Sequence, residues 1–146
     1  MKDNRKKILM RRRSGFTLIE IMVVVVILGL LAALVVPRIG PQVAEAQRTA
    51  AATQIKSIED ALEMYRMHNG FYPSTQQGLE ALVTAPTTSP VPKRYMDGGY
   101  IKKVPEDPWG NPYVYRNTNG RILIMSYGPD GEEGGEGVNE DITNED

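Results

Sequence analysis

The groups most able to do chemistry gather near the C-terminus, where residues 128–141 alternate carboxylates with glycines. Calcium takes roughly six to eight oxygen ligands from carboxylates and backbone carbonyls, and it needs a loop flexible enough to let them converge. Glycines supply that flexibility, and the acids supply negative charge. The D-x-D-x-D-G spacing of an EF-hand is absent from this segment. Composition alone therefore leaves two interpretations open, a calcium-binding loop and a solvated acidic tail, and it favours the tail.

A second chemical feature is the carboxylate of Glu20, which is the only charge within the apolar residues 16–36. As a helix, this run of 21 residues would extend about 31 Å, the thickness of one bilayer core. A carboxylate at that depth costs several kcal/mol unless a positive group pairs with it. Cleavage of the chain after Gly15 would create such a group, the new amine of Phe16, which a neighbouring chain would present at similar depth. Glu20 is therefore a candidate assembly residue.

Charge and composition exclude several classes of function. The net charge is −1, but residues 1–13 carry +6 and the remainder −7, so the positive charge is not spread over a folded surface. This pattern disfavours a nucleic-acid-binding protein. Without cysteine there is no disulfide, thiol nucleophile or thiolate metal site, and a single histidine, His68, disfavours both a multi-histidine metal centre and a Ser-His-Asp enzyme. We interpret His68 as a surface or capping residue at a helix end.

The first third of the chain has the layout of a membrane-targeting segment. Basic residues within 1–13 lie directly upstream of the apolar residues 16–36, which predicts a cytoplasmic N-terminus and export of the rest of the chain. The apolar run is too long for a cleavable secretory signal and lacks a small-x-small site. A generic signal anchor stays open, although Glu20 argues against it. Pro37 and Pro41 would break or kink a continuing helix, or Pro37 marks the membrane boundary.

The next segment predicts a helix with one buried face. Residues 42–67 are helical in composition, and their apolar side chains recur at spacings of three and four. Asn69-Gly70 supplies the stop, because glycine suits the left-handed cap position. The predicted apolar stripe consists of Ala51, Ile55, Ile58, Leu62 and Tyr65.

The remaining residues predict a small, turn-rich domain. A short helix is expected within residues 71–82, with Ser74 or Thr75 as its cap. Two strand-like runs at residues 113–116 and 121–126 flank an Asn-Gly dipeptide, which is a strong hairpin signal. The tail beyond these runs has no apolar periodicity.

The start of the apolar run resembles a known processing signal. The sequence SGFTLIE at residues 14–20, after a basic leader and before an apolar helix, is similar to the class III signal of type IV pilins and type II secretion pseudopilins. The resemblance implies that a prepilin peptidase cuts after Gly15 and methylates the new amine of Phe16. It also implies that Glu20 pairs with the Phe16 amine of a neighbouring subunit, and that the helix near Pro37 unwinds locally in a filament. Family members often carry Lys or Arg before the glycine, where this chain has serine.

Later segments resemble one branch of this family, the major pseudopilins of type II secretion, or general secretion pathway protein G. The similar segments, in the expected order, are NGFYPSTQQGLEAL, a proline loop ending in GGY, DPWGNPYVYR and GPDGEEGGEG. Type IV pilins usually close this region with a disulfide, so the absence of cysteine favours the pseudopilin. The resemblance implies one calcium ion (Ca2+) held by the side chains of Asp130 and Asp141 and the backbone carbonyl of Tyr127. Asn139 and Glu136 are weaker candidate ligands, and the ion would staple a small domain.

The expected fold is α+β and type IV pilin-like, with a long N-terminal transmembrane and filament helix packed on a small antiparallel sheet and a C-terminal calcium loop. Four segments are expected. They are a cleaved basic leader at 1–15, a transmembrane and filament-core helix at 16–36, its kinked continuation into the periplasm at 37–70, and a small periplasmic domain with an acidic loop at 71–146. The chain is expected in the inner membrane as a single-pass protein and, after assembly, in a periplasmic filament.

The function that the resemblance implies is mechanical and not enzymatic. The chain would be the major structural subunit of the type II secretion pseudopilus, a periplasmic filament that drives export of folded proteins across the outer membrane. Expected partners are other copies of the chain, minor pseudopilins, the prepilin peptidase and the inner-membrane secretion platform, with no nucleic acid. Two alternatives are a type IV pilin-like subunit for adhesion, motility or DNA uptake, and an anchored periplasmic enzyme. The enzyme would need a nucleophile–base pair, which one histidine and no cysteine disfavour.

Overall fold

The structure, a computed structural model, describes residues 15–145, apart from the side chains of residues 35–39. In chain order its elements are helix α1 (Leu18–Asn69), the 3-10 helix η1 (Leu79–Leu82), strands β1 (Val114–Thr118) and β2 (Arg121–Ser126), the 3-10 helix η2 (Gly137–Asn139) and strand β3 (Ile142–Thr143). The chain divides into two compact units, one ending at Gly40 and one beginning at Pro41, and each is described by itself. The predicted basic leader, up to Ser14, lies outside the described residues.

Helix α1 continues through Pro37 and Pro41, so the break that these prolines predict is absent. A proline removes one backbone hydrogen bond, and the remaining bonds of the helix are sufficient here to keep it continuous. A kink at Pro37 and a role of Pro37 in assembly stay predictions. The stop is confirmed, because α1 ends at Asn69 and Gly70 follows with φ of 85°. The N–H of Gly70 donates to the carbonyl of Arg66 at 2.7 Å, which closes the last turn.

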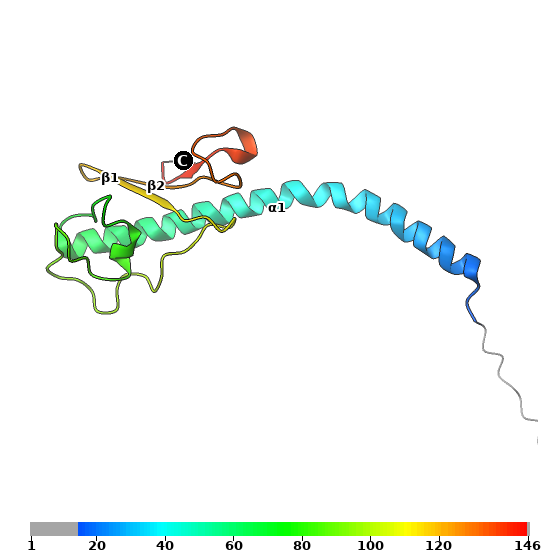
Figure 1. The fold of residues 1–146 in the computed structure, drawn as a ribbon, viewed down its shortest axis with the longest axis horizontal. Helices are drawn as coiled ribbons and strands as arrows, with labels where there is room; N and C mark the ends of the chain where they lie inside the picture. Colours follow the sequence, from blue (N-terminus) through cyan, green and yellow to red (C-terminus); the bar gives the residue numbers. More distant parts are fainter. Residues whose placement is uncertain (1–14, 146) are drawn as a thin grey trace, which may run out of the picture. The chain divides into compact units, whose positions relative to one another are not determined.

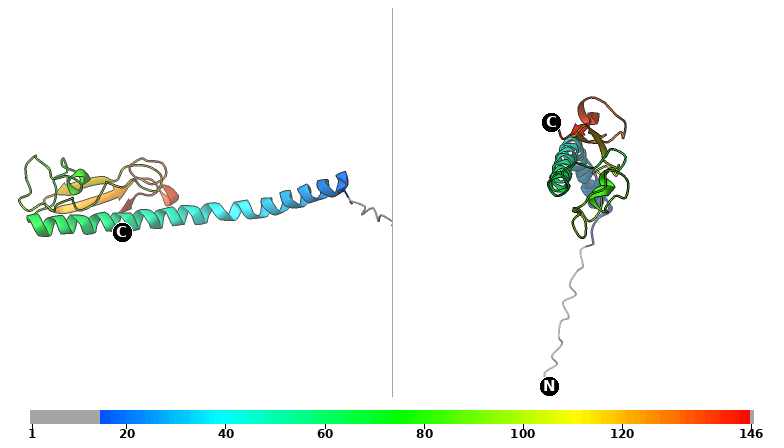
Figure 2. Two further views of the ribbon diagram at one scale, coloured as in Figure 1. Left: turned by 90° about the horizontal axis from the view of Figure 1, so that it is seen from below. Right: turned by 90° about the vertical axis from the view of Figure 1, so that its left-hand side faces the viewer.

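The predicted apolar stripe of α1 forms the helix side of the hydrophobic core. Its five members are each at most 2% exposed: Ala51, Ile55, Ile58, Leu62 and Tyr65. They pack in one cluster with side chains of η1 and of all three strands, among them Leu82, Ile124 and Ile142. Figures 1 and 2 show the sheet and the C-terminal segment lying along one side of the second half of α1. The expected fold, a long helix packed on a small antiparallel sheet, is therefore confirmed.

The sheet has the order β1-β2-β3, and both pairs are antiparallel. The predicted hairpin is confirmed, with β1 at residues 114–118 and not 113–116. Thr118 pairs with Arg121, which leaves a two-residue turn of Asn119 at φ 55° and Gly120 at φ 89°. Two positive φ values are the requirement of a type I′ turn, which Asn-Gly meets at little steric cost. Strand β3 was not predicted, because its two residues are embedded in a polar tail.

The short helix predicted within residues 71–82 is the four-residue η1, and the prediction of its cap was wrong. No side chain caps η1. Ser74 instead closes a turn with Gln77, since its N–H donates to Gln77 Oε1 at 2.9 Å and its Oγ accepts from the Gln77 N–H at 3.2 Å. Thr75 Oγ1 accepts from the N–H of Asn117 at 2.8 Å and donates to its carbonyl at 3.2 Å. The hydroxyls of Ser74 and Thr75 therefore bind backbone groups outside η1.

An aromatic cluster covers the end of α1. The ring of Tyr65 lies 6.1 Å from Phe71, 6.2 Å from Tyr95 and 5.2 Å from Tyr100, measured between ring centroids. Burial raises the pKa of Tyr65 to about 12, because the cluster shields the phenolate from water. His68 is exposed, with Nδ1 3.2 Å from the hydroxyl of Tyr100, which confirms its interpretation as a surface residue.

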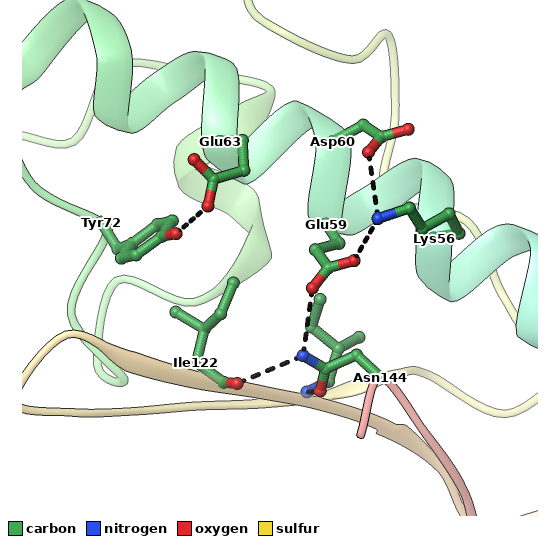
Figure 3. Close-up of polar contacts among 8 residues, drawn as sticks. Lys56, Glu59, Asp60, Glu63, Tyr72, Ile122 and Asn144 are labelled. Atoms are coloured by element: carbon green, nitrogen blue, oxygen red, sulfur yellow. Dashed lines mark hydrogen bonds and ion pairs between the residues drawn. The ribbon is translucent and has the colours of Figure 1, made fainter. Parts of the chain in front are cut away.

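Polar contacts connect α1 to the loop that follows it. The hydroxyl of Tyr72 donates to Glu63, whose Oε2 also accepts from Arg66 Nη2 at 2.8 Å (Figure 3 shows the first of these contacts). The hydrogen bond from Tyr72 is the largest cause of the lowered pKa of Glu63, and Arg66 lowers it further. The Arg66 guanidinium also lies 5.2 Å from the centroid of the Tyr72 ring. These three side chains fix the chain direction after the helix end.

The contact of Tyr72 with Glu63 yields a testable prediction. Tyr72→Phe removes the hydroxyl, and we expect the free energy of unfolding at neutral pH to fall by about 1 kcal/mol, because Glu63 is partly exposed. A lowered carboxyl pKa stabilises the fold above the unfolded-state pKa, and this stabilisation is lost as pH falls through the folded-state pKa. Variant and wild type should therefore converge in acid. Chemical denaturation across pH measures this, and an undiminished difference in acid would contradict it.

The C-terminus is attached to the sheet by the side chain of Asn144 (Figure 3). Its Oδ1 accepts from the N–H of Ile124 at 2.8 Å, and its Nδ2 donates to the carbonyl of Ile122 at 3.3 Å. The backbone N–H of Asn144 donates to the carbonyl of Ile124 at 3.1 Å. Nδ2 also lies 3.5 Å from Glu59 Oε1 on α1, and Glu59 in turn pairs with Lys56 at 2.8 Å. The side chain of Asn144 thus extends the pairing of β3 beyond its own backbone.

Candidate functional site

Glu20 lies in the first turn of α1, whose N-terminus is built by Thr17. The carbonyl of Thr17 accepts from the N–H groups of Glu20 at 3.1 Å and Ile21 at 3.2 Å, and its Oγ1 lies 3.3 Å from the Glu20 nitrogen. The helix dipole favours a carboxylate at this position. Phe16 is 76% exposed and precedes Thr17 directly. Cleavage after Gly15 would therefore place the new amine and the Glu20 carboxylate at the same end of one helix.

Residues 18–34 of α1 expose apolar side chains on all faces of the helix. Every Leu, Ile, Val and Met of residues 18–34 is at least 46% exposed. Helices on the surface of a soluble domain are apolar on one face only, so a helix that is apolar all round is normally covered by other molecules. Among the described residues, no helix has both the length and the apolar character of a membrane-spanning segment.

At the C-terminus, Asp141 is the predicted calcium ligand whose geometry fits best. Its Oδ2 accepts from the N–H of Gly134 at 2.9 Å, whereas Oδ1 is buried and has no hydrogen-bond partner among the described residues. A buried carboxylate oxygen is costly unless a donor or a cation satisfies it. The loop around it is tight, because a Cβ on Gly135, at φ 93°, would lie 2.3 Å from the carbonyl oxygen of Asn139. Only glycine fits there.

The other predicted ligands are brought together in part. Gly128, next to Tyr127, lies near the far end of the loop, since a Cβ on it would be 3.7 Å from the carbonyl oxygen of Glu140 and 3.9 Å from that of Asn139. Asp130 is exposed, and its Oδ1 accepts from the N–H of Glu132 at 3.2 Å. Within residues 15–145, no three His, Cys, Asp or Glu side chains form a metal-holding group. The available donors are carboxylate and carbonyl oxygens, the kind that calcium prefers.

The sequence analysis missed Arg48, which attaches the acidic loop to α1. Arg48 Nη1 donates to the carbonyl of Glu140 at 2.7 Å and lies 3.5 Å from the carbonyl of Val138. On β1, Arg116 Nη1 pairs with Glu133 at 3.1 Å. A single arginine on a helix gives no local signal of a partner 92 residues away, so the sequence offered no indication of this contact.

Comparison with known proteins identifies the family. The family model described as "Type II secretion system (T2SS), protein G" matches residues 38–145, and the "Prokaryotic N-terminal methylation motif" matches residues 10–36. The chain belongs to the type II secretion system protein G family. It is 57% identical over 136 residues to the type II secretion system core protein G of Pseudomonas aeruginosa, an alignment that covers 92% of this chain and 96% of the relative. The Vibrio cholerae core protein G is 53% identical over 137 residues, with 92% and 93% covered.

A solved structure supports the same family. The crystal structure of the major pseudopilin from the type 2 secretion system of enterohaemorrhagic Escherichia coli matches with a TM-score of 0.64 and 40% identity, over 71% of this chain and 87% of that one. Membership of the protein G family confirms the resemblance drawn from the motifs, and it supports the pseudopilin over the type IV pilin alternative. The separate roles of Gly15, Phe16, Glu20 and the calcium ligands stay predictions.

Proposed function

We propose that this member of the protein G family is the major structural subunit of a type II secretion pseudopilus. The observation that carries the proposal is the apolar helix of residues 18–34, exposed on all faces and headed by Glu20, in a chain of this family. Bundling many such helices would bury their apolar surface, at roughly 25 cal/mol per Å² of area removed from water. The filament would grow from the inner membrane into the periplasm and drive folded proteins across the outer membrane.

Before assembly, residues 16–36 would hold each subunit in the inner membrane as a single-pass anchor. The basic leader would keep the N-terminus cytoplasmic, and residues 37–146 would lie in the periplasm. The prepilin peptidase would remove the leader. The minor pseudopilins and the inner-membrane secretion platform would be the partners of the growing filament. The methylation motif that matches residues 10–36 supports the processing step.

Glu20 would make assembly stepwise. In the membrane its carboxylate is costly, and the amine of Phe16 on an adjacent copy is the positive group best placed to pair with it. Because both groups lie at the same end of α1, one subunit would offer its carboxylate to a neighbour that is shifted along the filament axis. Each subunit that joins the filament would then pair one buried Glu20 carboxylate with an amine.

Glu20→Ala tests the proposed function. We expect insertion and cleavage to stay normal, because the substitution makes the helix more apolar. Filament yield should fall at least about tenfold, since the neighbour's amine loses a partner worth more than about 1.4 kcal/mol in a membrane setting. The measurement is the amount of sheared filament recovered from cells that overproduce the chain, detected by immunoblot.

Glu45→Ala is the matched control, because Glu45 is an exposed glutamate of the same helix that lies outside its first turn. It should form filaments like wild type. Equal filament yields from Glu20→Ala and wild type would refute the pairing of Glu20 with the neighbouring amine.

We also propose that the C-terminal loop binds one calcium ion through the side chains of Asp130, Asn139 and Asp141 and the backbone carbonyl of Tyr127. The buried Oδ1 of Asp141, which has no partner among the described residues, supports this proposal. The ion would neutralise the carboxylates and hold the loop closed. Asp130 accepts from the Glu132 N–H through Oδ1, so Oδ2 would be its oxygen for the ion.

A further inference from the structure

A buried carboxylate lies in the turn formed by residues 107–111. Asp107 is 5% exposed. Its Oδ1 accepts from the N–H of Trp109 at 3.0 Å and from the N–H of Asn111 at 2.8 Å, which closes the turn. A turn of this kind needs no second carboxylate oxygen, yet Oδ2 has a partner from another part of the chain.

That partner is Ser126, the last residue of β2, which is completely buried. Ser126 Oγ donates to Asp107 Oδ2 at 2.6 Å and accepts from the N–H of Gly128 at 3.1 Å. The direction of both hydrogen bonds follows from the backbone N–H of Gly128, which can only donate, so that the Ser126 oxygen is its acceptor. The hydroxyl proton must point to Asp107, which leaves the oxygen lone pairs facing Gly128.

Both polar backbone groups of Gly128 are held by the same turn. Its N–H is bound through Ser126, and its carbonyl accepts from Asn111 Nδ2 at 3.2 Å. Gly128 is buried, so its backbone groups need partners within the protein, and its φ of 71° lies in the left-handed region. The start of the acidic loop therefore has one defined conformation.

The orientation of Tyr127 follows from this bond. The C=O of Tyr127 and the N–H of Gly128 belong to one planar peptide unit, and they point in opposite directions in a trans peptide. Because the N–H points at Ser126 Oγ, the carbonyl of Tyr127 points away from that hydroxyl. This carbonyl is the backbone group proposed above as a calcium ligand.

We infer that Asp107, Ser126 and Asn111 are positioning residues for the calcium site. They hold the two peptide groups on either side of Gly128, and through the first of these groups they set the direction of the Tyr127 carbonyl. The inference rests on the calcium binding proposed above. The hydrogen-bond partners of a metal ligand determine its orientation, and their loss typically weakens metal binding about 10- to 100-fold.

The test is calcium affinity of the full chain in detergent micelles, measured by isothermal titration with calcium chloride. Ser126→Ala should raise the Kd for calcium by about 10-fold or more. The matched control is Tyr115→Phe, which also removes a buried hydroxyl, one that donates to the carbonyl of Pro73 at 2.8 Å from the neighbouring strand. The control should lower the melting temperature equally with calcium and with chelator, and it should leave the Kd unchanged.

A second variant is needed if circular dichroism shows that Ser126→Ala does not fold. Asn111 is only partly buried, so Asn111→Ala should fold and still weaken calcium binding by releasing the Gly128 carbonyl. Wild-type Kd values in whichever variants fold would overturn the positioning role while the calcium site stands. A wild-type chain that does not respond to calcium would overturn the proposed site itself, and the inference with it.

Discussion

Replacing Gly15 by alanine should leave the leader attached to every copy of the chain. A peptidase that cuts after Gly15 must bind this residue in its active site. The backbone of residues 15–17 is irregular and exposed ahead of α1, so it is accessible. A Cβ on Gly15 meets no atom within 4 Å, so alanine causes no clash within the chain itself. Loss of cleavage would therefore reflect recognition by the enzyme and not misfolding. Intact mass spectrometry of membrane-extracted protein should show wild type starting at a methylated Phe16, without its first 15 residues, and the variant starting at Met1.

Gly29→Ala is the control for this prediction. Gly29 lies in the same apolar segment, and a Cβ on it also meets nothing within 4 Å. The leader of the Gly29→Ala variant should be cleaved completely, because residue 29 lies beyond the SGFTLIE signal. A wild-type chain that begins at any residue other than Phe16, or normal cleavage of Gly15→Ala, would refute the processing site.

Features set by local chemistry were predictable from the sequence. The stripe from Ala51 to Tyr65 follows the helical period, and each member is buried as expected. The hairpin turn follows from Asn119 and Gly120, because few other residue pairs tolerate two positive φ values. Both signals lie within a few residues of the structure that they specify.

Features that depend on distant partners were not predictable. Ser74 and Thr75 have the side chains of helix caps, but Gln77 and Asn117 offer their hydroxyls other partners. Strand β3 has only two residues, and its conformation is determined by pairing with β2 and not by its own pattern. The hydrogen bond from Arg48 to the Glu140 carbonyl depends on the same packing. For the same reason the sequence identified the acidic loop as a candidate site but not the residues that hold it in place.

Chelation of calcium should lower the melting temperature of the full chain in detergent by several degrees. A ligand that binds only the folded state stabilises it by RT ln(1 + [L]/Kd), so calcium at about 100 times its Kd should add roughly 2.7 kcal/mol. That is a large fraction of a small domain's stability. The loop of residues 128–141 should also become sensitive to protease when calcium is removed. Differential scanning calorimetry and limited proteolysis measure the two effects, and magnesium should restore little, because it needs a tighter octahedron and releases water reluctantly.

Substitutions in the loop separate a specific site from general charge neutralisation. Asp141→Ala should abolish the response to calcium, because its buried Oδ1 has no other partner among the described residues, and Asp130→Ala should weaken it. Glu132→Ala removes one charge from the same loop at an exposed position, and it should keep the full calcium response. A solvated acidic tail makes the opposite prediction, since ions would then act only by screening and all three variants would behave alike. If calcium changed the melting temperature no more than sodium chloride of equal ionic strength, the tail interpretation would be correct and the metal site would be excluded.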